Sequence, residues 1–160
     1  MDTDKLRIES ASEGDIPVLL TFIKELAAYE ELLDHVSVTE ERLRQALFGD
    51  ASSANAVIAY FDDLPVAFAI YFFNLSTFEG RPALYIEDIF VHPTFRRFGI
   101  GRKLFGFLSQ IAREQGCCRI ELSVLNWNEQ AIQFYKKLGG EPVKGWTVFR
   151  FSERAISDLI

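Results

Sequence analysis

Cysteine is nearly absent from this chain of 160 residues, and its two copies, Cys117 and Cys118, are neighbours. Adjacent cysteines rarely bridge because the geometry is strained, so the pair is interpreted as two small residues starting a buried strand, without redox or metal chemistry. Histidine is equally scarce, with only His35 and His92, and no serine stands in a G-x-S-x-G context. We therefore expect neither a metal site nor a serine-based catalytic triad, and interpret both histidines as structural.

Long hydrophobic runs are also missing. No stretch of about 18 apolar residues exists, which argues against a transmembrane helix. The N-terminus, MDTDKLRIES, is acidic and polar and does not resemble a signal peptide. We expect a cytoplasmic protein without membrane attachment. Its length is that of one domain, 1–160, with a core large enough to fold without disulfides or metal.

Positive charge is in the minority, with 17 Lys and Arg against 23 Asp and Glu and a net charge of −6, which argues against nucleic-acid binding. The two signs are also separated along the chain. Residues 25–41 contain six acids and no Lys or Arg, whereas residues 96–103 contain four bases and no acid. The first region suits a cation and the second an anion, although a merely solvated acidic face remains an alternative for the first.

The hydrophobic periodicity predicts alternating strands and helices. Short turns between the early strands and a helical crossover between two later ones predict an α/β (α+β) fold. Its central sheet is expected to be mixed, mostly antiparallel, of about six to seven strands, with helices on both faces. Strands are expected at 5–9, 54–60, 66–73, 83–91, 119–125 and 146–151, with a hairpin turn at Asp62-Asp63, and helices at 16–29, 40–49, 101–115 and 129–138, before a short polar tail.

An Arg- and Gly-rich turn joins the strand expected at 83–91 to the following helix. A helix N-terminus presents unpaired N–H groups and partial positive charge, and Gly99 and Gly101 would let a phosphate approach closely. A Rossmann turn needs a further glycine at position 104, and a P-loop needs lysine after the last glycine, so neither fits. The segment alone indicates an anion-binding helix start, or else glycines that only form a tight turn. The surrounding charge comes from Arg96, Arg97 and Arg102.

The motif Arg96-x-x-Gly99-x-Gly101 after a strand resembles the acetyl-CoA pyrophosphate motif, Q/R-x-x-G-x-G/A, of the GNAT acetyltransferases. The resemblance is closer to one branch, the diamine (spermidine/spermine) and thialysine N-acetyltransferases. Further matching stretches lie in the same order over most of the chain, at 23–30, 84–91, 127–129 and 134–136.

This resemblance implies a GNAT fold and acetyl-CoA as co-substrate. It also implies transfer of the acetyl group to the primary amine of a small cationic substrate, a diamine, polyamine or thialysine-like amino acid, by direct attack in a ternary complex. The branch is usually dimeric, which implies a homodimer, and the 15 Phe residues would suit an apolar interface.

Acetylation of an amine needs two proton transfers. The amine, with a pKa near ~10.4, must lose a proton before it attacks, and the departing thiolate must gain one. The resemblance assigns the first role to Glu87, which alternation places on the opposite strand face from Asp88; a surface carboxylate is the alternative. It assigns the second role to Tyr135, late in a helix, where core packing is the alternative.

The resemblance also implies binding residues. The main chain at 89–91 is expected to pair with the pantetheine arm as an added strand, with one N–H polarising the thioester carbonyl. The residues expected to bind the cofactor are Ile89, Phe90, Val91, Arg96, Arg97, Phe98, Gly99, Ile100, Gly101, Arg102, Asn128, Ala131 and Tyr135. Those expected to bind the amine are Tyr29, Glu30, Glu87, Glu121, Leu122 and Ser123.

The expected loop at 73–82 departs from the acidic loop of polyamine-acetylating relatives, which leaves diamines, thialysine-like amino acids and other primary amines open. Two other functions were weighed. A GNAT enzyme acting on a protein N-terminus or lysine is disfavoured by the acidic region. A non-catalytic acetyl-CoA-binding module is disfavoured because it would need neither Glu87 nor Tyr135.

Overall fold

The computed structural model describes residues 5–160 and forms two compact units, Met1–Leu125 and Asn126–Ile160. The prediction of a single domain over 1–160 stays a prediction. No helix within the described residues is long and apolar enough to cross a membrane.

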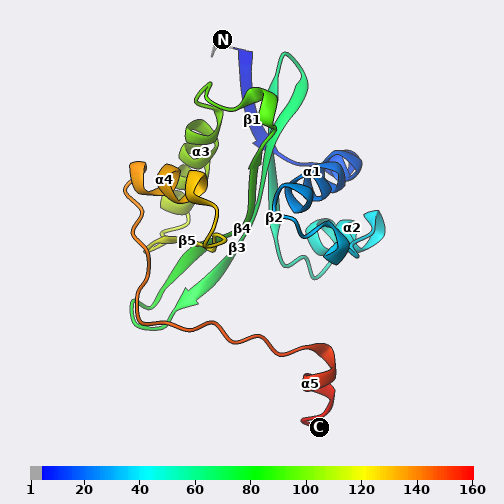
Figure 1. The fold of residues 1–160 in the computed structure, drawn as a ribbon, viewed down its shortest axis with the longest axis vertical. Helices are drawn as coiled ribbons and strands as arrows, with labels where there is room; N and C mark the ends of the chain where they lie inside the picture. Colours follow the sequence, from blue (N-terminus) through cyan, green and yellow to red (C-terminus); the bar gives the residue numbers. More distant parts are fainter. Residues whose placement is uncertain (1–4) are drawn as a thin grey trace. The chain divides into compact units, whose positions relative to one another are not determined.

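The first unit is built on a five-stranded sheet in the order β1-β2-β3-β4-β5 (Figure 1). β1 (Leu6–Ser10), β2 (Asn55–Phe61), β3 (Leu64–Ser76) and β4 (Arg81–Val91) pair successively in antiparallel fashion. β5 (Ile120–Leu122) returns after a helical crossover and pairs in parallel with β4. The expected α+β class, with a mixed and mostly antiparallel sheet, is confirmed.

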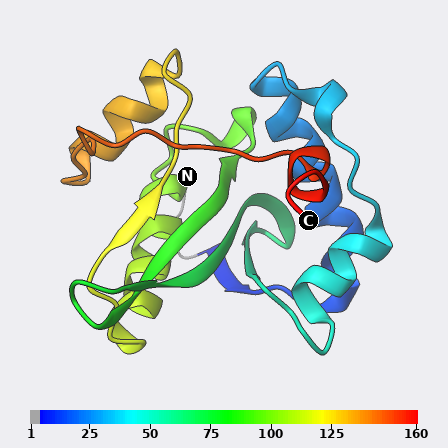
Figure 2. The same ribbon diagram turned by 90° about the horizontal axis from the view of Figure 1, so that it is seen from below.

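Helices cover both faces of this sheet, as expected. α1 (Ile16–Tyr29) and α2 (Glu40–Phe48) pack on one face, and α3 (Ile100–Glu114) packs on the other (Figure 2). The apolar residues of each helix recur every three or four positions, so each buries one stripe against the sheet. Short 3₁₀ turns, η2 (Glu13–Asp15), η3 (Leu33–His35) and η4 (Pro93–Phe95), connect these elements.

Aromatic rings fill the core beneath α1. Phe22 of α1 stacks on Phe68 of β3 with the ring centroids 5.6 Å apart, and both rings lie against Phe90 of β4. These buried rings hold α1 against β3 and β4, and so fix the end of α1 relative to the end of β4.

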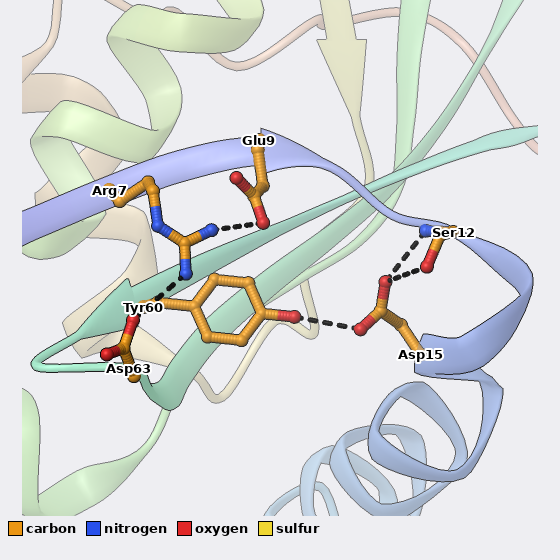
Figure 3. Close-up of polar contacts among 6 residues, drawn as sticks. All are labelled: Arg7, Glu9, Ser12, Asp15, Tyr60 and Asp63. Carbon is orange, nitrogen blue, oxygen red and sulfur yellow. Dashed lines mark hydrogen bonds and ion pairs between the residues drawn. The ribbon is translucent and has the colours of Figure 1, made fainter.

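A polar network joins the start of α1 to the β1–β2 pair (Figure 3). The Tyr60 hydroxyl donates to Asp15 Oδ1 at 2.9 Å, and the Ser12 amide and hydroxyl donate to Asp15 Oδ2 at 2.7 and 2.8 Å. The Arg7 guanidinium lies 4.5 Å from the centroid of the Tyr60 ring. Ser12 is thus the N-cap of the 3₁₀ turn that leads into α1. The remaining contacts are the ion pairs of Arg7 with Glu9 and Asp63.

Two hairpins differ in how well the sequence predicts them. Asp62 and Asp63 both have positive φ, 49° and 62°, in the expected turn between β2 and β3. The expected loop at 73–82 is much shorter, because strand pairing continues to Ser76 and Arg81. The turn proper is 77–80, and it ends with Gly80 at φ 62°.

The expected strand at 146–151 is wrong, which leaves five strands in the described chain instead of six to seven. Its alternation of apolar residues fits a strand, but a strand forms only where a neighbour accepts its backbone hydrogen bonds, and the described part of the second unit contains no other strand. That unit contains α4 (Glu129–Lys137), where a helix was expected. It also contains α5 (Glu153–Ser157), where a polar tail was expected. Ser152 caps α5 by accepting from the Ala155 amide at 3.2 Å.

Candidate active site

β4 and β5 separate at the centre of the first unit. Their parallel pairing covers only Leu84–Ile86 with Ile120–Leu122, yet β4 continues to Val91. Beyond Ile86, β4 therefore keeps β3 on one side and pairs with no described strand on the other. The backbone at 89–91 thus offers a free strand edge, which can add an extended ligand as a further strand.

A β-bulge lies at the point where the two strands separate. Ile70 of β3 faces Asp88, but the next residue, Tyr71, faces Ile86, so Glu87 is an extra residue in β4. The side-chain alternation changes here, because Ile86 packs in the core beneath α3 whereas Phe90, four residues later, packs beneath α1. The unbroken alternation that placed Glu87 and Asp88 on opposite faces is therefore wrong.

Three acids gather around this bulge. Burial and, to a smaller extent, the nearby carboxylates of Glu87 and Glu30 together raise the pKa of Asp88 to about 6. Burial also raises the pKa of Glu30, which caps the C-terminus of α1. We call Glu30, Glu87 and Asp88 the acid cluster. Carboxylates held this close favour a cation among them.

Asp88 is a residue that the sequence interpretation missed. Its signal was two adjacent acids inside an otherwise apolar strand. An unbroken period of two assigned Asp88 to the face away from Glu87, and only the bulge overturns that assignment.

The turn after β4 leads directly into α3 and leaves the first amides of that helix open to an anion. Arg97 and Gly99 adopt positive φ, 68° and 80°, and α3 begins at Ile100. The first intrahelical bond is from the Lys103 amide to the Gly99 carbonyl at 3.1 Å, so the amides of 100–102 have no acceptor within the helix. These donors and the helix dipole fit a pyrophosphate.

The side chains in this turn differ in their exposure to solvent. Arg97, Phe98 and Arg102 are exposed, whereas Ile100 is buried beneath α3, so Ile100 can offer only its backbone to a ligand. Gly101 lies in the first turn of the helix.

Arg96 ties the turn to two neighbouring elements. Its Nε donates to the Val91 carbonyl at 3.0 Å, and its guanidinium lies 4.6 Å from the centroid of the Tyr29 ring. It also lies 5.6 Å from the centroid of the Phe90 ring. Arg96 therefore fixes the end of β4 against α1.

Three residues expected near the amine, Glu121 and Leu122 of β5 and Ser123 directly after it, have partners within the first unit. Glu121 pairs with Arg119 at 3.0 Å, and the Ser123 hydroxyl lies 2.7 Å from that of Tyr85. Leu122 packs against the core beneath α3. Of the carboxylates expected near the amine, Glu121 is therefore already paired with a cation, whereas no ion pair joins Glu30 or Glu87 to a described Lys or Arg.

The second unit carries the remaining expected residues on α4. Asn128 is its N-cap, and Asn128 Oδ1 accepts from the Ala131 amide at 3.2 Å. Tyr135 lies in the last turns of α4, with its ring 5.4 Å from that of Phe134. The Tyr135 carbonyl accepts from the Gly140 amide at 3.0 Å, which ends the helix. Within the described residues no group of three or more His, Cys, Asp or Glu side chains is arranged to hold a metal ion.

Comparisons with known proteins agree with this geometry. Residues 22–140 match the family described as "Acetyltransferase (GNAT) family". The chain is 37% identical to a thialysine N-epsilon-acetyltransferase of Bos taurus over 95% of each chain. It is 34% identical to a human spermidine/spermine N(1)-acetyltransferase-like protein 1, over 98% of this chain and 24% of that protein. An integron cassette protein from V. cholerae shares the fold, with a TM-score of 0.80 at 24% identity over 97% of both chains.

Proposed function

The chain belongs to the GNAT acetyltransferase family, and on that premise we propose that it acetylates a primary amine of a small cationic substrate, by direct attack in a ternary complex. The substrate class comprises diamines, polyamines and thialysine-like amino acids. Acetyl-CoA dependence and N-acetyltransferase activity follow from the family itself. The observation that carries the proposal is the acid cluster at the β4 bulge.

The acid cluster provides the attraction for the substrate. Near neutral pH the carboxylates of Glu30 and Glu87 raise the cost of ionising Asp88, and a bound ammonium relieves that cost. The relatives named for thialysine and for spermidine/spermine acetylation support a substrate with more than one cationic or polar group.

Glu87 is proposed as the group that takes the proton from the attacking amine, directly or through a water molecule. Its side chain is exposed, so a substrate can reach it, and its bulged position turns it out of the regular strand. Asp88, which is half-buried, is proposed to hold a cationic group of the substrate next to it.

Acetyl-CoA, when bound, supplies an acetyl group activated as a thioester. The amides at the start of α3, with Arg97 and Arg102, are proposed to hold its pyrophosphate. The free edge of β4 at 89–91 is proposed to pair with the pantetheine arm, and one amide there to polarise the thioester carbonyl. Asn128 and Ala131 are proposed as further contacts.

Tyr135 is proposed to donate its hydroxyl proton to the departing thiolate. The proposal is supported by its match to the family motif and by its place in α4. A homodimer is also proposed, supported by exposed apolar side chains such as Phe78 in the β3–β4 turn.

Release of free thiol from acetyl-CoA tests the proposed function. The rate is measured without an acceptor and with 1,4-diaminobutane, thialysine, spermidine, or a peptide bearing a free N-terminus and a lysine. We expect at least one small cation to raise the rate far above the peptide. Preference for the peptide would establish the protein-acetylating alternative, and a rate that no amine changes would contradict the proposal.

A further inference from the structure

A second feature of the first unit lies away from the acid cluster. A hollow of about 270 Å³ opens between α1, the start of β3 and η4. Much of its wall is apolar, with Val18 and Phe22 from α1, Leu64 from β3 and Phe95 from η4. A space of this size and lining suits a small molecule with a short apolar body.

Glu25 contributes the only acidic group to this wall. One of its carboxylate oxygens, Oε2, is out of reach of water and accepts no hydrogen bond within the described residues. No Lys or Arg lines the hollow. A buried carboxylate oxygen without a donor has lost its hydrogen bonds to water without replacement, and a ligand with a positively charged N–H group would supply the missing donor.

His92 forms another part of the wall. Its Nδ1 accepts from the Thr94 amide at 3.3 Å, which places the proton of the neutral ring on Nε2. Its ring also packs edge-on against Phe95 at 6.0 Å. The aromatic rings of Phe22, Phe95 and His92 thus give a cation polarisable surroundings.

The hollow is separate from the acid cluster. Along β4, His92 lies four residues beyond Asp88, which corresponds to roughly 13 Å of extended chain. Along α1, Glu25 lies five residues before Glu30, or about 7 Å of helix. No residue that lines the hollow belongs to the set expected to bind acetyl-CoA or the acceptor amine.

We propose that this hollow binds a small primary ammonium ion with a short alkyl body, with its charge on Glu25. The proposal does not rest on the identity of the acetyl acceptor, because no residue that lines the hollow is proposed to bind that acceptor. Thr21, also in the wall, donates its hydroxyl to the Pro17 carbonyl at 2.9 Å and is uncharged, so Glu25 is the lining residue whose negative charge can balance the ammonium.

The small number of histidines allows a direct test by NMR, because the chain has only two imidazole rings, those of His35 and His92. The signal of His92 is assigned in His35→Gln, and the wild-type protein without acetyl-CoA is titrated with butylammonium chloride at constant ionic strength. We expect a saturable shift of the His92 signal, and none with 1-butanol, which has the same body without the charge.

Variants show whether Glu25 carries the site. Glu25→Gln, close in shape, is expected to weaken binding by about ten-fold or more, whereas Glu13→Gln, an exposed acid, and Glu87→Gln, in the acid cluster, retain it. Leu64→Trp, at a position 53% exposed, is expected to block the hollow without touching Glu25, so it serves if Glu25→Gln does not fold. The proposal is overturned if His92 shows no saturable shift, if butanol shifts it equally, or if both Glu25→Gln and Leu64→Trp bind like wild type.

Discussion

At the scale of single residues, Asp88 has a charge that depends strongly on its surroundings. Burial, together with the smaller effects of Glu87 and Glu30, raises its pKa from 3.8 to about 6. A carboxyl whose folded-state pKa is raised stabilises the fold below its unfolded pKa, and that contribution is lost as the pH rises through about 6. Ionised Asp88 therefore makes the fold less stable at neutral pH, and a bound cation would offset that loss of stability.

Replacing Asp88 with Asn removes this cost. We expect Asp88→Asn to raise the free energy of unfolding by about 2 kcal/mol at pH 7.5, and by less than half as much at pH 4.5, in urea titrations without substrate. Asp50→Asn, at an exposed position, is the matched control and should give no gain that depends on pH. An equal gain from Asp88→Asn at both pH values would contradict the raised pKa.

Asp15 shows the opposite behaviour. Burial raises its pKa, but hydrogen bonds from Ser12 and Tyr60 outweigh burial and leave the pKa below its ordinary value. Stability from such a carboxylate is present above its unfolded pKa and is lost as the pH falls through the folded value. Burial, followed by the bond to Asp15, raises the pKa of Tyr60 to about 12.

Tyr60→Phe removes the donor to Asp15 Oδ1. We expect a loss of about 1 kcal/mol in the free energy of unfolding at pH 7, and a smaller loss as the pH falls through the lowered pKa of Asp15. Tyr71→Phe is the control, because the Tyr71 ring is buried too but its hydroxyl makes no hydrogen bond to a described residue. Similar losses from both variants would show that ring packing, and not the bond, matters.

At the scale of elements, local sequence predicted the helices α1 to α4 to within about a residue but missed the short α5. α3 begins at Ile100, one residue before the expected start, because apolar spacing and the glycine turn both act locally. The bulge at Glu87 could not be predicted, since it depends on which β3 residue each β4 residue faces. The strand expected at 146–151 failed for a related reason, because strand formation depends on a partner that the segment itself does not specify.

Gly99 tests the turn before α3. Its φ of +80° favours glycine, so Gly99→Ala should cost about 1 kcal/mol of stability and raise the KM for acetyl-CoA. Gly106, inside α3 with open space around its Cα, is the matched control, and Gly106→Ala should raise the stability by about 0.5–1 kcal/mol without changing that KM. Thermal unfolding and steady-state kinetics check both, and an unchanged KM in Gly99→Ala would argue against pyrophosphate binding at this turn.

At the scale of the whole molecule, the acidic and the basic stretch of the sequence both contribute to the first unit, where parts of them lie next to each other. The acidic stretch supplies Glu30 at the end of α1, while the basic stretch supplies the turn before α3, and Arg96 joins them through its contact with Tyr29. Composition and spacing predicted both charges. Neither identified Asp88 as part of the cluster or Glu121 as already paired with Arg119, because both facts depend on three-dimensional neighbours.

The most direct test of the central claim is the steady-state rate of acetyl transfer to 1,4-diaminobutane, or to whichever small amine proves the better acceptor, by the wild type, Glu87→Gln and Tyr135→Phe. The account predicts that Tyr135→Phe lowers kcat by about 10²-fold or more with the affinity for acetyl-CoA retained. It predicts that Glu87→Gln shifts the pH–rate profile or raises the KM for the amine. Wild-type kcat in Tyr135→Phe, together with an unchanged pH–rate profile and amine KM in Glu87→Gln, would contradict the account.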